Sequence, residues 1–143
     1  MTASILPVAL EIASLRTAII AARVATQRQQ QVLLVSTPDA AAQAGSLWFI
    51  EIARQTASEV PEAEVSMVLD CGDTAGYALE ALHSGAGGII FRGQTETTRR
   101  LQQLADLQDA LFLMARPRCL FLDREPDPLA ACRAWFWFRE EPT

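Results

Sequence analysis

The sequence contains no lysine and no asparagine, so all twelve basic residues are arginine. A Schiff-base lysine and a P-loop lysine are therefore excluded, as is the lysine that phosphorelay receivers require. The only histidine is His83, which we expect near the C-terminal end of a helix, away from the strand ends considered below. A Cys-His or Ser-His pair would depend on this one residue, so we expect a solvated histidine rather than a catalytic one.

Cysteine is scarce as well. The three cysteines, Cys71, Cys119 and Cys132, are odd in number and widely spaced, with no CxxC pair. This usage is typical of a reducing compartment and predicts neither a zinc site nor any other bound metal or cofactor. Cys71 stands between carboxylates at a predicted helix start, and we expect an inert, half-buried thiol there.

The charge balance is acidic, with a net charge of −5 over 143 residues and a pI near 4.8. Nucleic acid is therefore not an expected partner, because its phosphates require a basic surface. The apolar segment 5–25 contains Glu11, Arg16 and Arg23, and such central charges are costly in a lipid bilayer. With no signal peptide evident, we expect a cytoplasmic protein without a membrane partner.

The most regular stretch of the chain is 66–93, which reads as one βαβ unit. An apolar run, 67–69, precedes a helix whose apolar stripe contains Ala75, Ala78, Leu79 and Leu82. Gly85 stands where a left-handed residue would end that helix. A second buried strand follows at 89–91.

The remainder of the chain continues this alternation of strands and helices. We expect further strands at 5–12, 32–35 and 111–114, although 5–12 could also form the first turns of a helix. The helix after 32–35 begins at Thr37 or, after a loop, at Ser46. The link 116–118 is too short for another crossover helix, so we expect 119–122 to be an antiparallel edge strand or an extended arm.

These elements predict a single three-layer αβα domain with a mainly parallel five-stranded sheet, of flavodoxin-like or Rossmann-like architecture. The core sheet and its helices would occupy residues 1–118. Residues 119–143 would form a C-terminal arm and an aromatic helix.

One segment resembles a known family. The sequence "ALEALHSGAGGIIF" is similar to the repeating helix–strand unit of phosphate-binding (β/α)8 barrels and their aldolase and epimerase relatives. The resemblance is carried by Ala78, Leu79, Ala81, Leu82, Gly85, Ala86 and 89–91. It implies a packed helix–strand unit rather than a full barrel, which typically needs ~250 residues. The catalytic lysine of many such aldolases has no counterpart here.

Polar side chains follow the ends of four predicted parallel strands. In an open parallel sheet, ligands bind outside these carboxyl ends. We therefore predict a ligand site there, with Asp70 as the candidate catalytic acid or base. The expected ligand-binding residues are Ser36, Thr37, Asp39, Asp73, Thr74, Arg92, Gln94, Thr95 and Arg116.

This set of hydroxyls, carboxylates and arginines suits a small anionic or polyhydroxylated ligand. Several members also have simpler interpretations. Asp73, Thr74 and Thr95 are suitable helix caps, and each arginine could form an ordinary ion pair. Asp39, Asp70 and Asp73 could hold Mg²⁺, although their spacing matches no metal signature.

The C-terminal helix ends in four consecutive aromatic residues, Trp135, Phe136, Trp137 and Phe138. Consecutive residues on a helix point about 100° apart, so these four cannot all face one core. Large aromatics with arginine are typical of interface cores. We therefore expect a homo-oligomer with these residues at or near its interface.

Two functional hypotheses follow. The first is a small-molecule binding protein for an anionic ligand, extended to a lyase or isomerase if Asp70 acts as an acid or base. The second is a non-enzymatic assembly or accessory protein that acts through homo- or hetero-oligomer interfaces. The two differ in whether Asp70, Arg92 and Arg116 line a common cleft or are paired internally.

Overall fold

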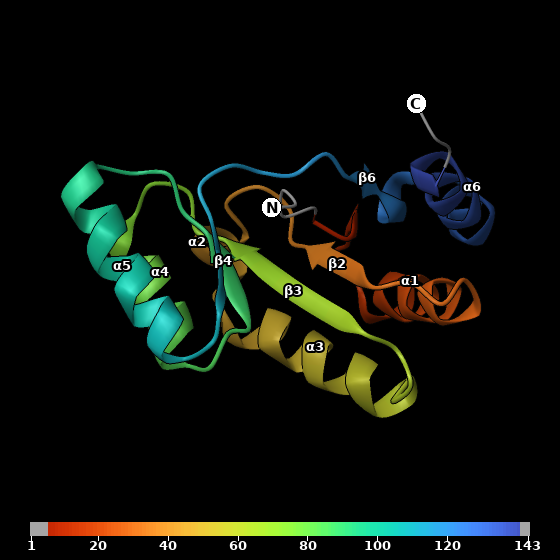
Figure 1. Ribbon diagram of the computed structural model, residues 1–143, viewed down its shortest axis with the longest axis horizontal. Helices are drawn as coiled ribbons and strands as arrows, with labels where there is room; N and C mark the ends of the chain where they lie inside the picture. The colour runs from red at the N-terminus through yellow and green to blue at the C-terminus, as the bar shows by residue number, and fades with distance from the viewer. Residues whose placement is uncertain (1–5, 141–143) are drawn as a thin grey trace, which may run out of the picture.

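The structure is a computed structural model that describes residues 6–140. Ile5, the first residue of the predicted strand 5–12, lies outside the described residues. The elements, in chain order, are β1 (Val8–Glu11), α1 (Leu15–Gln27), β2 (Val32–Val35), α2 (Ala40–Ala44), α3 (Leu47–Glu59), β3 (Val65–Asp70), α4 (Ala75–His83), β4 (Gly88–Ile90), α5 (Thr95–Leu107), β5 (Leu111–Leu113), β6 (Leu120–Phe121), a short 3-10 helix (Leu122–Arg124) and α6 (Pro128–Glu140) (Figure 1).

The predicted fold class is confirmed. The chain forms a single α/β domain with a six-stranded sheet in the order β5-β4-β3-β2-β1-β6. Every neighbouring pair of strands is parallel. The β2 strand contributes four fully buried residues, the pattern of a central strand in a sheet covered on both faces. Strands and helices alternate along the chain, as in Rossmann and flavodoxin architectures.

The helices lie in one row along the sheet, in which α6 packs on α1, α1 on α3, and α4 on α5. The strand order explains this arrangement. From β1 to β5 each strand is added on the same side of the previous one, and right-handed crossovers in one direction place every connecting helix on one face. The main core contains alternate strand residues such as Leu10, Leu34 and Leu69 together with helix residues.

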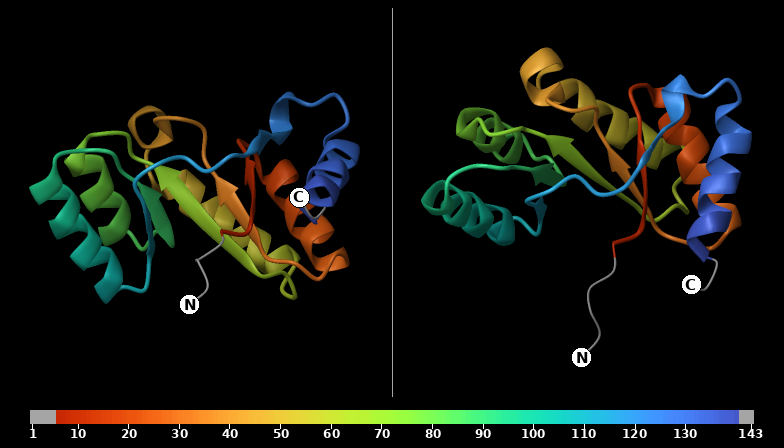
Figure 2. Two further views of the ribbon diagram at one scale, coloured as in Figure 1. Left: turned by 45° about the horizontal axis from the view of Figure 1, so that its top comes forward. Right: turned by 90° about the horizontal axis from the view of Figure 1, so that it is seen from above.

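The opposite face of the sheet is covered by extended chain. Its buried residues, including Leu33, Val68 and Ile90, pack with Leu6 and Cys119 but with no helix residue among the described ones. The connection 114–119 runs across this face, on the side away from α3 (Figure 2, right). The third layer expected from the sequence is therefore a thin one, formed by this connection, which we call the crossing link.

The crossing link corrects the expectation for residues 119–122. Leu120 and Phe121 form β6, which is parallel to β1 at the far edge of the sheet, not antiparallel. The prediction allowed an antiparallel edge strand or an extended arm and did not include a parallel strand. A nearly extended chain of about seven residues spans roughly 24 Å, which matches about five strand spacings. The crossover needs no helix because it traverses the whole sheet as extended chain.

Two local expectations are resolved at the start of the chain. Val8–Glu11 is a strand, and α1 is a separate helix whose N-cap Ser14 accepts a hydrogen bond from the Thr17 N–H. After β2, the chain forms two helices, with Asp39 in the left-handed conformation at φ 56° before α2. Ser46 precedes α3, but its hydroxyl donates to Glu80 of α4 instead of capping the helix.

The central βαβ unit agrees with the sequence except at one position. Gly85 follows α4 with φ +92°, the left-handed residue that was expected to end this helix. Ala78 and Leu82 are buried, but Leu79 is 52% exposed. Leu79 therefore faces the neighbouring α5 rather than the core. No helix among the described residues is long and apolar enough to cross a membrane.

Candidate functional site

Asp70 ends β3 and is fully buried, at 0% exposure. Its Oδ2 accepts a hydrogen bond from Arg116 Nη1 at 2.8 Å, and its Oδ1 accepts one from the Gly72 N–H at 2.9 Å. A second guanidinium, that of Arg92, lies 3.7 Å from Oδ1. Both carboxylate oxygens therefore have partners within the chain.

Arg116 lies on the crossing link and connects the ends of three strands. Besides Asp70 of β3, it donates to the carbonyl of Ser36, directly after β2, at 3.1 Å and to Glu11 of β1 at 2.9 Å. Burial lowers the pKa of Arg116, but the hydrogen bond with Asp70 and the nearby acidic groups outweigh this and raise it. We call Glu11, Ser36, Asp70 and Arg116 the Arg116 latch.

Ser36 completes the latch through its hydroxyl. The residue is fully buried. Its Oγ accepts a hydrogen bond from the Asp70 N–H at 2.8 Å and donates to the Thr37 carbonyl at 3.2 Å. With Arg92 included, two cations and two carboxylates neutralise one another. This arrangement favours a structural role for Asp70, Ser36 and Arg116, because a ligand would have to displace existing partners.

Three other predicted site residues do converge on an open hollow of about 410 Å³ beside the latch, lined by Asp73, Ala75, Phe91, Arg92, Gly93, Gln94 and Thr97. The side chain of Arg92 is 44% exposed. The hollow lies outside the carboxyl ends of β3 and β4, where the chain enters α4 and α5. Ligands of open parallel sheets bind outside the carboxyl ends of the strands.

The four remaining predicted residues lie outside both groups. Thr74 occupies the N-cap position of α4 without a side-chain capping bond, and Thr95 is the first residue of α5. Thr37 is half-buried, and Asp39 is exposed. Asp39 Oδ1 lies 2.5 Å from the position that a Cβ on Gly72 would take, so a side chain there would displace Asp39, and the φ of +61° at Gly72 itself favours glycine.

No three of the His, Cys, Asp and Glu residues in the described part of the chain form a group that could hold a metal ion. In particular, Asp39, Asp70 and Asp73 are not such a group. Oxygen ligands for Mg²⁺ would need free carboxylates, and Asp70 is already occupied by Arg116 and Gly72.

The cysteines show no sign of activation. Burial raises the pKa of Cys71 to about 12, and the adjacent Asp70 contributes to this shift. Burial also raises the pKa of Cys132 to about 12 and raises that of Cys119. All three thiols are therefore held in the protonated form, which is neither a nucleophile nor a metal ligand.

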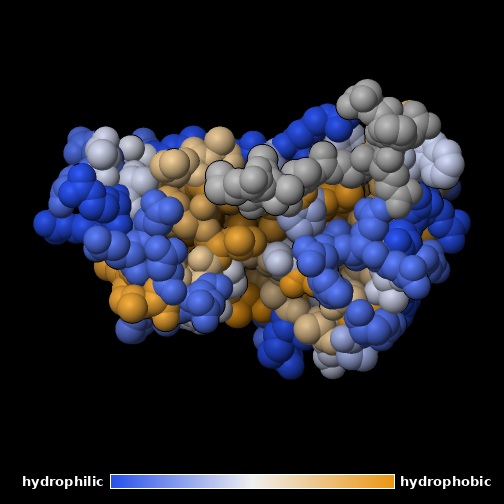
Figure 3. Space-filling model, in the orientation of Figure 1, coloured by the Kyte–Doolittle hydropathy of each residue, from blue (hydrophilic) through white to orange (hydrophobic). Residues whose placement is uncertain are grey.

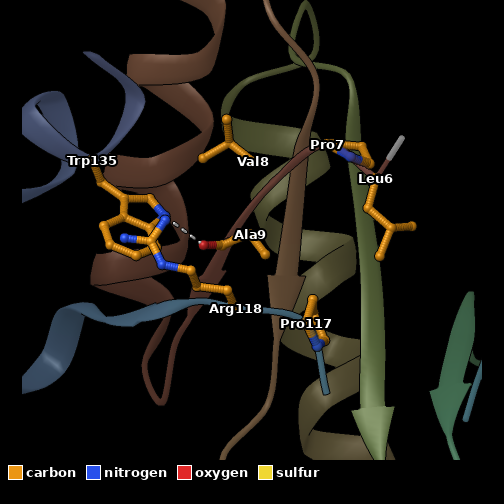
Figure 4. Close-up of a pocket in the computed structure, with 7 residues that line it drawn as sticks. All are labelled: Leu6, Pro7, Val8, Ala9, Pro117, Arg118 and Trp135. Atoms are coloured by element: carbon orange, nitrogen blue, oxygen red, sulfur yellow. Dashed lines mark hydrogen bonds between the residues drawn. The ribbon is translucent and has the colours of Figure 1, made fainter. Parts of the chain in front are cut away.

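Sequence reasoning missed a second hollow, of about 280 Å³, near the start of β1 (Figure 4). The ring of Trp135 lies between the carbonyl of Ala9, to which its Nε1 donates at 2.8 Å, and the guanidinium of Arg118, 4.3 Å from the ring centre. Pro7 and Pro117 line the other side (Figure 4). The hydrogen bond of Trp135 holds α6 against β1, and its ring holds Arg118 of the crossing link.

The C-terminal aromatic residues divide into two pairs. Phe136 is fully buried, and Trp135 is partly buried in the contacts just described. Trp137 and Phe138 are 55% and 66% exposed. An interface role for this helix would therefore rest on Trp137 and Phe138 only.

Comparison with known proteins gives no family assignment. No protein-family model matches the chain, and no curated protein matches its sequence.

Proposed function

We propose that this protein is a non-enzymatic assembly or accessory protein whose α/β body presents apolar helix surfaces to other protein chains. The proposal rests on a contrast between polar side chains that are paired inside the fold and large apolar side chains that are exposed. Asp70, Ser36 and Arg116, the strongest candidates for chemistry, are bound to one another inside the fold. Large apolar side chains on the helices are exposed instead: Leu47, Tyr77, Leu79, Leu107, Leu129, Trp137 and Phe138.

Exposed apolar area of this kind is typical of surfaces that bind other chains. Two regions stand out on the helices. One lies between α4 and α5 and includes Leu79 and Leu107; the other lies on α6 and includes Trp137 and Phe138. Apolar residues gather over the C-terminal half of α5 on the face shown in Figure 3 (lower left).

Sedimentation velocity over a range of protein concentrations tests this proposal. We expect the wild type to self-associate. A variant in which Leu79 and Trp137 are both changed to Glu should stay monomeric with an unchanged circular dichroism spectrum. A wild type that shows no association at any concentration, and no response to the two substitutions, would leave the proposal without support.

The second candidate is binding of a small anion in the hollow beside Arg92. The observation that favours it is the 44% exposed guanidinium of Arg92, which lines the hollow outside the carboxyl ends of β3 and β4. Gln94 and the first turn of α5 would add donors. Asp73 on the rim and Glu96 in the first turn of α5 oppose it, because both are acidic.

A thermal-shift titration with inorganic phosphate and small carboxylates separates the two candidates. The first candidate predicts no shift. A stabilisation that disappears in Arg92→Gln but persists in Arg118→Gln would favour the anion site. Arg118 is a suitable control because it is also an exposed arginine but lies against Trp135, away from the hollow.

A further inference from the structure

An open groove of about 510 Å³ separates α4 from α5. Leu79 and Gly76 line it from α4, and Leu104 and Leu107 line it from α5. Leu79 is 52% exposed and Leu107 is 84% exposed. The groove is therefore an apolar surface that the monomer does not cover.

The groove side of α5 follows a regular helical spacing. Arg100, Gln103, Leu104 and Leu107 stand at i, i+3, i+4 and i+7 and all line the groove. Leu101 and Ala105 are buried in the core, and Leu101 also lines the groove. A helix with one stripe packed on its own core and a second stripe on an open groove is suited to contact another helix.

No described segment of the chain covers this groove. The last described helix, α6, packs on α1 at the other end of the sheet from α4 and α5 (Figure 1). The groove is therefore accessible to a second molecule.

The charges along α5 indicate which molecule fits. Its N-terminal half contains Arg99 and Arg100 with a single acid, Glu96, to which both are paired. Its C-terminal end contains Asp106, followed just after the helix by Asp109. Among the described residues neither aspartate has a cationic partner. The helix is therefore positive at one end and negative at the other, and it complements an antiparallel copy of itself.

We propose that the α4–α5 face binds the same face of a second copy, with the two α5 helices antiparallel about a twofold axis near Gln103. This inference rests on the proposed function and names its partner. Arg99 of each copy then lies beside Asp106 of the other, since both side chains project from one side of the helix. Leu107 of each copy enters the groove beside Leu79 of the other, and the helix dipoles oppose one another.

The first test uses Leu107→Glu, followed by sedimentation velocity. A carboxylate in the apolar groove should weaken the dimer by roughly tenfold or more. The matched control is Met114→Glu, which alters an apolar residue 62% exposed on the crossing link, outside the groove. The control should leave the dimer unchanged.

The second test addresses the antiparallel orientation. Arg99→Asp and Asp106→Arg should each weaken the dimer, and the double variant should restore it, because the pair is re-formed with reversed charges. Gln103→Cys should give a disulfide-linked dimer under mild oxidation, since the two copies of this residue meet near the axis. Gln102→Cys projects from another side of the helix and should crosslink no more than the wild type.

A monomeric wild type, a dimer unaffected by Leu107→Glu, or a charge-swap double variant no better than the single variants would each overturn the inference. A wild type that associates but ignores the α5 variants, while responding to Trp137→Glu, would overturn the inference and leave the proposed function standing. A monomeric wild type that phosphate stabilises through Arg92 would remove both.

Discussion

The Arg116 latch and the α4–α5 groove differ in whether the chain itself supplies partners for their side chains. The latch gathers charged and hydroxyl groups, and the chain itself supplies their partners: Asp70 and Ser36 are fully buried and hydrogen-bonded. The groove gathers leucines, and the chain leaves them uncovered, with Leu107 84% exposed. Residue type alone predicts a functional surface at the strand ends, whereas the partners that each group already has favour our proposal that this surface lies on the helices.

The physical reason for the latch lies in the strand order. Right-handed crossovers leave one face of the sheet without helices, and the chain must return across that face to reach β6. A link without regular structure needs side-chain contacts to hold it, and buried charges need partners. Arg116 meets both requirements by binding the ends of β1, β2 and β3 at once.

The largest expected effect comes from breaking the latch. Arg116→Met should lower the free energy of unfolding by about 3–5 kcal/mol, because it leaves the buried Asp70 carboxylate without its closest counter-charge. Urea unfolding followed by circular dichroism measures this loss. Asp70→Asn combined with Arg116→Met should recover part of it, because the buried site then carries less unpaired charge.

Arg118→Met is the matched control on the same link. Its guanidinium is exposed and stacks on Trp135, so its loss should cost about 0.5–1 kcal/mol. Equal losses for Arg116 and Arg118 would mean that the latch contributes no more than a surface contact, and the contrast between the two regions would disappear.

A smaller effect is expected at Gly72, beside the latch. Gly72→Ala should destabilise the fold by about 1–2 kcal/mol, because alanine is strained at φ +61° and its methyl would meet Asp39. Gly76→Ala, on α4 with nothing within 4 Å of the new methyl, should instead stabilise it by about 0.5–1 kcal/mol. Thermal unfolding of the two variants compares these opposite signs directly; a Gly72→Ala variant as stable as Gly76→Ala would contradict the account.

The effect that is smallest at neutral pH, where it is absent, is a dependence of stability on alkaline pH. Burial raises the pKa of Cys71 and Cys132 from 9.0 to about 12. The unfolded chain loses these thiol protons first, so stability should be fully present below about pH 9 and fall as the pH rises towards 12. Urea midpoints across this range measure the slope. A variant with both residues changed to Ser should show a flatter profile, and an unchanged slope would assign the dependence to other groups.

The sequence carried enough information for the class of fold and for most elements. Buried runs such as Val32–Val35 indicate parallel strands, and Gly85 ends α4 as expected. The strand β6 was misplaced because local spacing says nothing about a link that crosses the whole sheet. The latch was also out of reach: Arg116 and Glu11 lie 105 residues apart in sequence, and only the strand order brings them together.

For a related reason, the sequence could not show which of the predicted site residues are already paired inside the fold. Arg92 and Arg116 look alike in sequence, since each follows a strand. In the structure, the side chain of Arg116 is 21% exposed and that of Arg92 is 44% exposed. The exposed Leu79 shows the same limit, because helical spacing placed it on the buried stripe. Whether Leu79 is covered depends on how closely α4 and α5 pack together, and helical spacing does not report this packing.

Hydrogen exchange at low and high protein concentration tests the central claim most directly, because it reports which backbone segments become protected when chains associate. The account predicts that protection rises with concentration in α4 and α5, while the ends of β1, β2 and β3 and the crossing link are already protected in the monomer. Concentration-dependent protection at the crossing link or the strand ends, with α4 and α5 unchanged, would contradict it.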